Sequence, residues 1–178
     1  MDRRTRARAA GRRRARHEVL DGELFATPAP SWRHQAVVSA LQPELREYVR
    51  ANRIGWAMLS PADVVFSPRR LVQPDLFVVP WQDGGAPRVW TDVKSLLLAV
   101  EVLSPATARA DRHRKRIIYQ SERVPEYWIV DADARLVERW RPDDERPEIL
   151  LDELTWTPRE GVAPLRLPLE PFFEEAGE

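Results

Sequence analysis

The segment that most constrains the fold is residues 96–103, in which seven of eight residues are apolar and the eighth is Glu101. A run this short and this apolar is typical of a central strand that helices cover on both faces. It is well short of the roughly 20 apolar residues that a membrane-spanning helix needs, so we expect no membrane partner. The segment therefore predicts an α/β fold built around a covered sheet.

Other segments supply the remaining elements of such a fold. Asp21-Gly22 separates two short apolar runs and predicts a hairpin over residues 17–26. Ser31 can cap a helix that runs to about Asn52 and contains Pro43. Further strands are expected at residues 56–59, 63–66, 71–79, 127–130 and 136–140, and a second helix at residues 109–123. Strands interleaved with helices predict a mixed central β-sheet flanked by α-helices.

Length and composition limit the organisation of the chain. At 178 residues it suits one hydrophobic core, so we expect a basic arm at residues 1–16, a single domain at 17–170 and an acidic tail at 171–178. Residues 142–178 lack a clear period and are expected to wrap the core. The chain has no cysteine, which excludes disulfides, a thiolate nucleophile and cysteine-ligated metals. No secretory signal pattern is present, so a cytoplasmic location is expected.

The N-terminal arm is strongly basic although the formal net charge of the chain is zero. Residues 1–16 hold eight arginines and one acid, whereas residues 143–178 hold eleven acids and three arginines. Such an arm could lie along nucleic acid phosphates. It could equally be a solvated tail, and the sequence leaves both interpretations open.

Glu101 is the first candidate site residue. An ionised carboxylate in the middle of a buried strand costs several kcal/mol unless a cation neutralises it. The sequence therefore predicts a metal ion or a basic side chain close to Glu101. A structural salt bridge or a position at the wet end of the strand would also satisfy it.

Asp75 is the second candidate, because Pro74 removes a ladder donor and belongs at a strand start or a bulge. An aspartate after proline is often only a turn residue. Asp75 and Glu101 lie on separate strand segments, however, and could converge as oxygen ligands for a hard divalent cation such as Mg²⁺.

Lys115 is the third candidate. It is one of only two lysines among 28 basic residues, and it follows Asp111 by four positions, with Tyr119 four positions further on. A lysine at the metal site could orient the attacking water or stabilise charge on phosphorus. An ordinary ion pair with Asp111 is the alternative. Glu23 and His34 are weaker candidates beside the first hairpin and helix.

Together these motifs resemble the Uma-type putative restriction endonuclease family, within the PD-(D/E)XK nuclease superfamily. The resemblance covers residues 17–170. It is carried by Asp21-Gly22-Glu23, Arg33-His34, Gln73-Pro74-Asp75, residues 101–105, Lys115 and residues 126–131. It implies a restriction-endonuclease-like fold and metal-dependent phosphodiester hydrolysis with Mg²⁺, for which Mn²⁺ can substitute.

By position, Asp75 resembles the motif aspartate and Glu101 the motif acid, and both would hold the metal. Glu23 resembles a further acid near the site and is a candidate third ligand. The usual acid-x-lysine would place lysine at 103, where this chain has Leu103, so the resemblance implies that Lys115 supplies the ammonium. The arginine-rich arm also departs from the family's usual helical beginning.

Two classes of function follow. The first is a Mg²⁺-dependent endonuclease acting on double-stranded DNA, for which a homodimer is an option by analogy, because cutting both strands needs two centres. A protein–protein module that uses exposed tryptophans is a further option. The second class is a catalytically silent module on the same fold that binds nucleic acid or assembles with protein. In that module, six basic residues would contact phosphates: Arg69, Arg70, Arg109, Arg112, Arg114 and Arg116.

Overall fold

A six-stranded sheet forms the centre of the molecule in a computed structural model that describes residues 16–82 and 85–177. Its strand order is β10 (Glu148–Leu150), β9 (Leu136–Trp140), β8 (Glu126–Asp131), β7 (Leu98–Val102), β6 (Leu76–Pro80) and β3 (Gly55–Leu59). β7 and β8 pair in parallel and the other neighbours are antiparallel, so the predicted mixed sheet is confirmed. β7 is buried along its whole length, as its sequence predicts.

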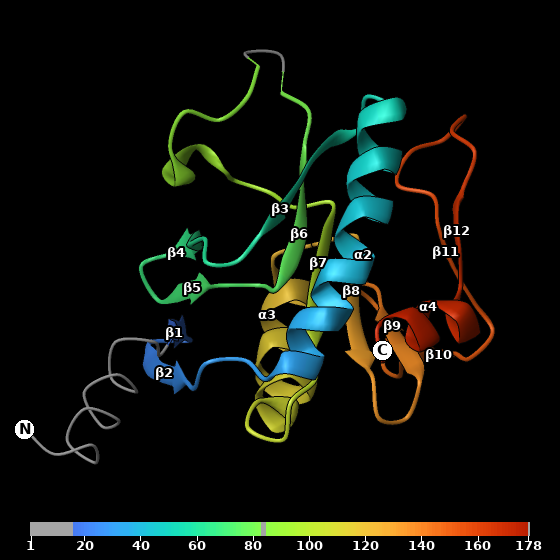
Figure 1. Cartoon of the computed structure of the whole chain (residues 1–178). Coiled ribbons are helices and arrows are strands. Elements are labelled where there is room, and N and C mark those ends of the chain that lie inside the picture. The colour runs from blue at the N-terminus through green and yellow to red at the C-terminus, as the bar shows by residue number, and fades with distance from the viewer. Residues whose placement is uncertain (1–15, 83–84, 178) are drawn as a thin grey trace, which may run out of the picture.

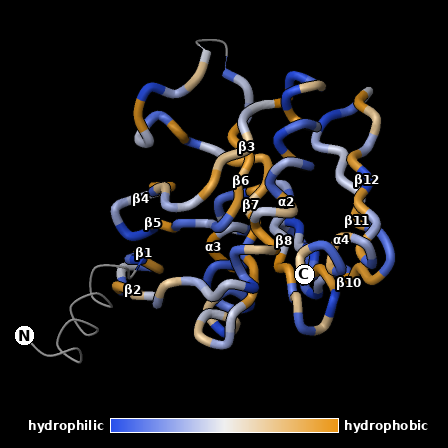
Figure 2. Tube along the Cα trace, viewed as in Figure 1, coloured by the Kyte–Doolittle hydropathy of each residue, from blue (hydrophilic) through white to orange (hydrophobic). Residues whose placement is uncertain are grey.

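Two hydrophobic clusters cover the two faces of this sheet, because successive strand residues point to opposite sides. On β7, Leu98 and Val100 belong to the cluster that contains α2 (Trp32–Ala51), α4 (Leu169–Glu175) and the hairpin of β11 (Glu153–Trp156) and β12 (Leu165–Pro168). Ala99 belongs to the cluster that contains α3 (Arg116–Ser121). Figure 1 shows the sheet between these layers, and Figure 2 shows apolar residues concentrated along its central strands.

A smaller sheet lies beside the α3 face and has the order β2 (Glu23–Thr27), β1 (Arg16–Leu20), β5 (Arg70–Val72) and β4 (Val64–Ser67). The predicted hairpin is confirmed, since Leu20 pairs with Glu23 across the Asp21-Gly22 turn. Both turn residues have positive φ, at 54° and 92°. Arg16, the last residue assigned to the basic arm, begins β1; residues 1–15 of that arm lie outside the described residues.

The long helix begins and ends where the sequence predicts. The Ser31 side chain accepts a hydrogen bond from the His34 backbone N–H, and Asn52 is the C-terminal cap. Pro43 lies inside the helix on its exposed side. This cap fixes the position of His34 in the first turn of α2.

One expectation about the elements is wrong. The expected strand at 71–79 is two strands, β5 and β6, because Pro74 has no N–H to donate and interrupts the ladder. The C-terminal region is more ordered than its weak periodicity indicates, since it forms β10, β11, β12 and α4. Residues 171–175 of the expected acidic tail lie in α4, where Phe172 and Phe173 are buried. Within the described parts of the chain, no helix is long and apolar enough to span a bilayer.

Candidate active site

The site is built around Glu101, whose side chain points from β7 toward the α3 face. Strand alternation places Glu101 on the same side as Ala99, opposite Val100 and Val102. Its side chain is 3% exposed, and its Oε1 accepts a hydrogen bond from the Tyr119 hydroxyl at 3.1 Å. The predicted need for a neutralising partner is therefore real.

Lys115 is that partner. It ends a π-helical turn, Ala110–Lys115, that leads into α3, and π-helical turns occur often at functional sites. Its Nζ lies 2.9 Å from Glu101 Oε1, 3.0 Å from Glu18 Oε2 and 3.4 Å from Asp111 Oδ1. Three carboxylates from three elements thus surround one buried ammonium.

The excess of acid in this cluster changes the protonation of its members. Burial raises the pKa of Glu101 and of Asp111, although the Lys115 charge opposes both shifts. Burial disfavours the charged form of Lys115, but the charges of Glu101, Asp111 and Glu18 outweigh it and raise the Lys115 pKa above its ordinary value. Lys115 is therefore an ammonium at neutral pH, and Glu101 and Asp111 retain protons to a higher pH than usual.

Asp75 lies beside this cluster at the start of β6. Its Oδ2 accepts hydrogen bonds from the Val102 backbone N–H and from His34 Nε2, both at 2.9 Å, while Oδ1 pairs with Arg16. Burial alone would raise the Asp75 pKa, but the His34 hydrogen bond and the Arg16 charge lower it to about 2. Asp75 is therefore ionised and fixed next to the residue that follows Glu101.

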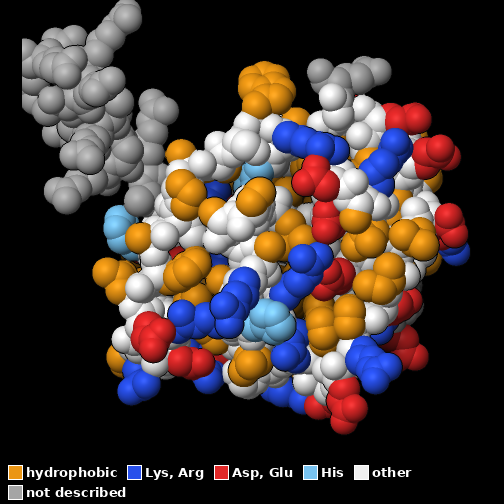
Figure 3. All heavy atoms as spheres, turned by 90° about the horizontal axis from the view of Figure 1, so that it is seen from below, with side chains coloured by type: hydrophobic (Ala, Val, Ile, Leu, Met, Phe, Trp, Pro, Cys, Tyr) orange, Lys and Arg blue, Asp and Glu red, His pale blue; other side chains and the backbone are white. Residues whose placement is uncertain are grey.

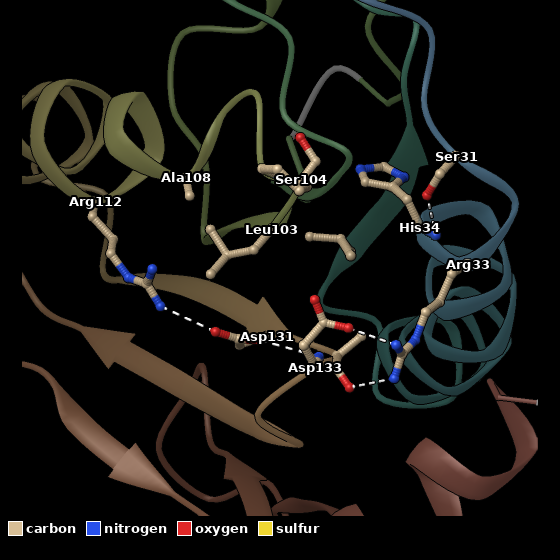
Figure 4. Close-up of a pocket in the computed structure, with 12 residues that line it drawn as sticks. Ser31, Arg33, His34, Leu103, Ser104, Ala108, Arg112, Asp131 and Asp133 are labelled. Atoms are coloured by element: carbon tan, nitrogen blue, oxygen red, sulfur yellow. Dashed lines mark hydrogen bonds and ion pairs between the residues drawn. The ribbon is translucent and has the colours of Figure 1, made fainter.

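A pocket of about 220 Å³ opens at the same end of the sheet, where β7 and β8 finish and α2 begins. The His34 ring lines it, and His34 Nδ1 is buried without a hydrogen-bond partner among the described residues. Arg33 pairs with Asp133 and Arg112 with Asp131 along the wall (Figure 4). The pocket reaches His34, whose Nε2 is hydrogen-bonded to Asp75.

Comparison with known proteins identifies the family of this chain. The family model described as "Uma2: Putative restriction endonuclease" matches residues 7–170, which is most of the chain.

The chain belongs to the Uma2 family.

Membership supports a nuclease function in general and a hydrolase acting on phosphodiester bonds. The fold is also that of a crystal structure described as a putative nuclease belonging to DUF820 from Anabaena variabilis, with a TM-score of 0.71, 20% identity and 90% of each chain covered. The restriction-endonuclease-like fold is thereby confirmed. No curated protein matches the chain.

In this Uma2 chain the structure brings together most of the residues that the sequence singles out. Glu101 and Lys115 are in direct contact, with Asp111 and Tyr119 beside them, and the bonded pair of Asp75 and His34 is adjacent. Glu23 is not in the cluster, because its carboxylate is exposed and pairs with Arg114.

Glu18 is the site residue that the sequence analysis missed. It is buried, contacts Lys115, and accepts a hydrogen bond from the Gln73 backbone N–H at 2.7 Å. One signal could have found it: Glu18 shares the inward face of β1 with Leu20, whereas Glu23 begins the exposed partner strand.

The donor set suits a hard divalent cation in chemistry and charge. Its ligand atoms are carboxylate oxygens, four buried acids outnumber the single buried lysine, and neither carboxylate oxygen of Asp111 has a hydrogen-bond partner among the described residues. As the side chains lie in residues 16–82 and 85–177, however, no three His, Asp or Glu residues are grouped to hold a metal.

The arginines proposed as phosphate contacts are mostly engaged within the protein. Ion pairs with acidic side chains hold Arg70, Arg112 and Arg114, and Arg116 packs over the Trp140 ring at 4.7 Å. Figure 3 shows basic side chains near the centre of one face with acidic ones around them. These four are therefore poor candidates for a dedicated phosphate-binding surface.

Proposed function

We propose that this chain is a Mg²⁺-dependent endonuclease that hydrolyses phosphodiester bonds in DNA. The observation that carries the proposal is the convergence of Glu101 and Lys115, from a strand and a helix 14 residues apart, beside the ionised Asp75. A purely structural ion pair would need one carboxylate for one ammonium. Here three carboxylates contact Lys115, and the surplus negative charge is what a bound cation would neutralise.

Asp75 and Glu101 would hold the metal. Bound Mg²⁺ would polarise a phosphoryl oxygen and lower the pKa of water at the site. Hydrogen bonds from Val102 N–H and His34 hold the Asp75 carboxylate in place, and its low pKa keeps it anionic near neutral pH. A bound cation would oppose the upward pKa shifts of Glu101 and Asp111 and favour their ionised forms.

Lys115 is proposed to act as a charged donor. Its raised pKa makes it a poor base, so it would stabilise negative charge that develops on phosphorus and position the attacking water. The hydroxyl of Tyr119 would hold the Glu101 carboxylate in position, and the carboxylate of Glu18 would hold the Lys115 ammonium in position. These two are positioning residues, because neither would touch the scissile phosphate.

Cleavage of supercoiled plasmid with Mg²⁺, with Mn²⁺ and with EDTA tests the proposal. We expect nicking or linearisation only with metal, and loss of detectable cleavage in Glu101→Gln and in Lys115→Met, because uncatalysed phosphodiester hydrolysis is extremely slow. Glu23→Gln is the matched acidic control and should retain cleavage. A labelled RNA of the same sequence decides between DNA and RNA.

The catalytically silent alternative predicts a different pattern. The lack of a three-ligand group among the described residues favours it. It predicts salt-sensitive DNA binding with no cleavage under any metal. Equal cleavage by wild type, Glu101→Gln and Lys115→Met would instead place the reaction at another site.

A further inference from the structure

An open groove runs between the second half of α2 and the edge strand β3, away from the carboxylate cluster. It is lined by Arg46, Arg50 and Arg53, which form its basic wall, by residues 55–59 of β3 and by Trp81. Its volume is about 1090 Å³, above the roughly 300–1,000 Å³ of small-molecule pockets. In Figure 1, β3 begins beside the C-terminal end of α2. The shape suits a segment of a polymer more than a metabolite.

The three arginines of this groove differ from Arg70, Arg112 and Arg114, which are held in ion pairs. None of their guanidinium groups makes an ion pair or a hydrogen bond with residues 16–82 or 85–177, and no acidic residue lines the groove. Three exposed, unneutralised guanidinium groups, two on α2 and one just beyond its C-terminal cap, favour a polyanion.

Aromatic rings stand at the end of the basic wall. Trp81 stacks on Trp56 with ring centroids 4.7 Å apart and planes 10° from parallel. Trp81 is nevertheless 56% exposed, so its other face is open to solvent. An indole held flat by a second indole is a suitable platform for an unpaired nucleic acid base.

The groove leads to the proposed nuclease site. Gln42 and Leu59, which line it, also line an adjoining hollow of about 230 Å³ that contains Arg16 and Asp75. The two spaces therefore share a wall, and one extended strand could contact Trp81, the arginines and the Asp75 side of the site.

We propose that this groove binds a single-stranded segment of the nucleic acid substrate, with its phosphates on Arg46, Arg50 and Arg53 and a base on Trp81. The inference rests on the proposed function, because it extends the same substrate outward from Asp75. A second copy of the chain pairing with β3 is the competing occupant. A two-fold contact there would bring the arginine wall of each copy close to that of the other, which is unfavourable.

Binding of a fluorescein-labelled 12-nucleotide DNA strand in EDTA tests the proposal by fluorescence anisotropy. Arg46→Glu/Arg50→Glu is compared with Arg123→Glu/Arg166→Glu, a double variant with the same change in net charge at two exposed arginines outside the groove. We expect the groove variant to weaken binding at least tenfold beyond the control. Its salt dependence, the slope of log Kd against log salt, should fall by about 1.4, since each contact to a single strand contributes about 0.7.

The stacking platform is tested separately. Trp81→Ala should weaken single-strand binding by about tenfold, and Trp32→Ala, at the 86% exposed tryptophan that begins α2, should leave it unchanged. A duplex with a single-stranded overhang should bind more tightly than a blunt duplex, and Trp81→Ala should remove that preference.

Three outcomes overturn the inference. The first is an equal loss of DNA affinity in the groove and control variants, and the second is unchanged DNA affinity in Trp81→Ala. The third is a dimer in sedimentation that the groove variant dissociates while its DNA affinity matches that of the control. The proposed nuclease function fails differently. If the groove binds DNA in EDTA but the protein does not cleave DNA in Mg²⁺, the nuclease proposal is rejected and the groove proposal stands. If the protein cleaves DNA but the groove variants cleave and bind like the control, the groove proposal is rejected and the nuclease proposal stands.

Discussion

Lys115 is the cation that contacts Glu18, Glu101 and Asp111, and none of these carboxylates has another ion pair within residues 16–82 and 85–177. The other lysine of the chain, Lys94, is exposed. We expect Lys115→Met to lower the free energy of unfolding by about 3–5 kcal/mol at neutral pH, since it leaves buried acids uncompensated. Lys94→Met is the matched control and should stay within about 0.5 kcal/mol of wild type. Urea unfolding measures both.

The pH dependence of this loss is a second test of the same contact. Without Lys115, protonation is the remaining way to neutralise Glu101 and Asp111, so the Lys115→Met variant should recover stability as the pH falls. A loss of the same size at pH 5 and pH 8 would show that the ammonium acts by packing and not by charge.

For Asp75 we expect the opposite dependence on pH: its contribution to stability is lost as the pH falls. Its folded pKa is about 2 against an ordinary 3.8, so its ionised form stabilises the fold by about 2 kcal/mol above pH 3.8. That contribution is lost as the pH falls from about 4 to about 2. We expect the stability difference between wild type and Asp75→Asn to shrink over this range in urea titrations. A difference that is constant with pH would contradict the charge assignment.

At the scale of elements, the pairing of β3 with β6 depends on Gly55. A Cβ at this position would lie 1.9 Å from the Val79 carbonyl oxygen, so the strands could not stay in register without moving. Gly55→Ala should therefore destabilise the protein by about 1–3 kcal/mol.

Gly85 provides the comparison, because a Cβ there meets no atom within 4 Å and only its positive φ of 91° opposes substitution. In thermal melts, the Tm of Gly85→Ala should be well above the Tm of Gly55→Ala. The reverse order would mean that β3 adjusts freely. A mobile β3 would also alter the floor of the arginine groove.

At the scale of the whole molecule, the C-terminal region closes the α2 face of the sheet. Trp156 of β11 is buried, with its ring 5.8 Å from that of Trp128 on β8 and 5.7 Å from that of Tyr48 on α2. We expect Trp156→Ala to cost about 3–5 kcal/mol. The exposed Trp32→Ala should be close to neutral, and a small effect of Trp156→Ala would show that the hairpin is dispensable.

Local sequence determined the elements that have strong local signals. These elements could be predicted without the fold because each depends only on neighbouring residues. They are the alternating pattern of a strand, the Asp21-Gly22 turn, the Ser31 cap and the apolar run around Glu101. Glu101 itself could be named as a site residue, because a charge in a buried strand requires a partner wherever that partner lies.

Only the tertiary structure decided which partner that is. Lys115 reaches Glu101 through a π-helical turn that the apolar pattern does not reveal, and Glu18 arrives from a strand 83 residues before Glu101. The same holds for Glu23, which the sequence placed near the site and the fold leaves on the surface. Local patterns fix which way a side chain faces along its own element, whereas distances between side chains depend on how the sheets and helices pack.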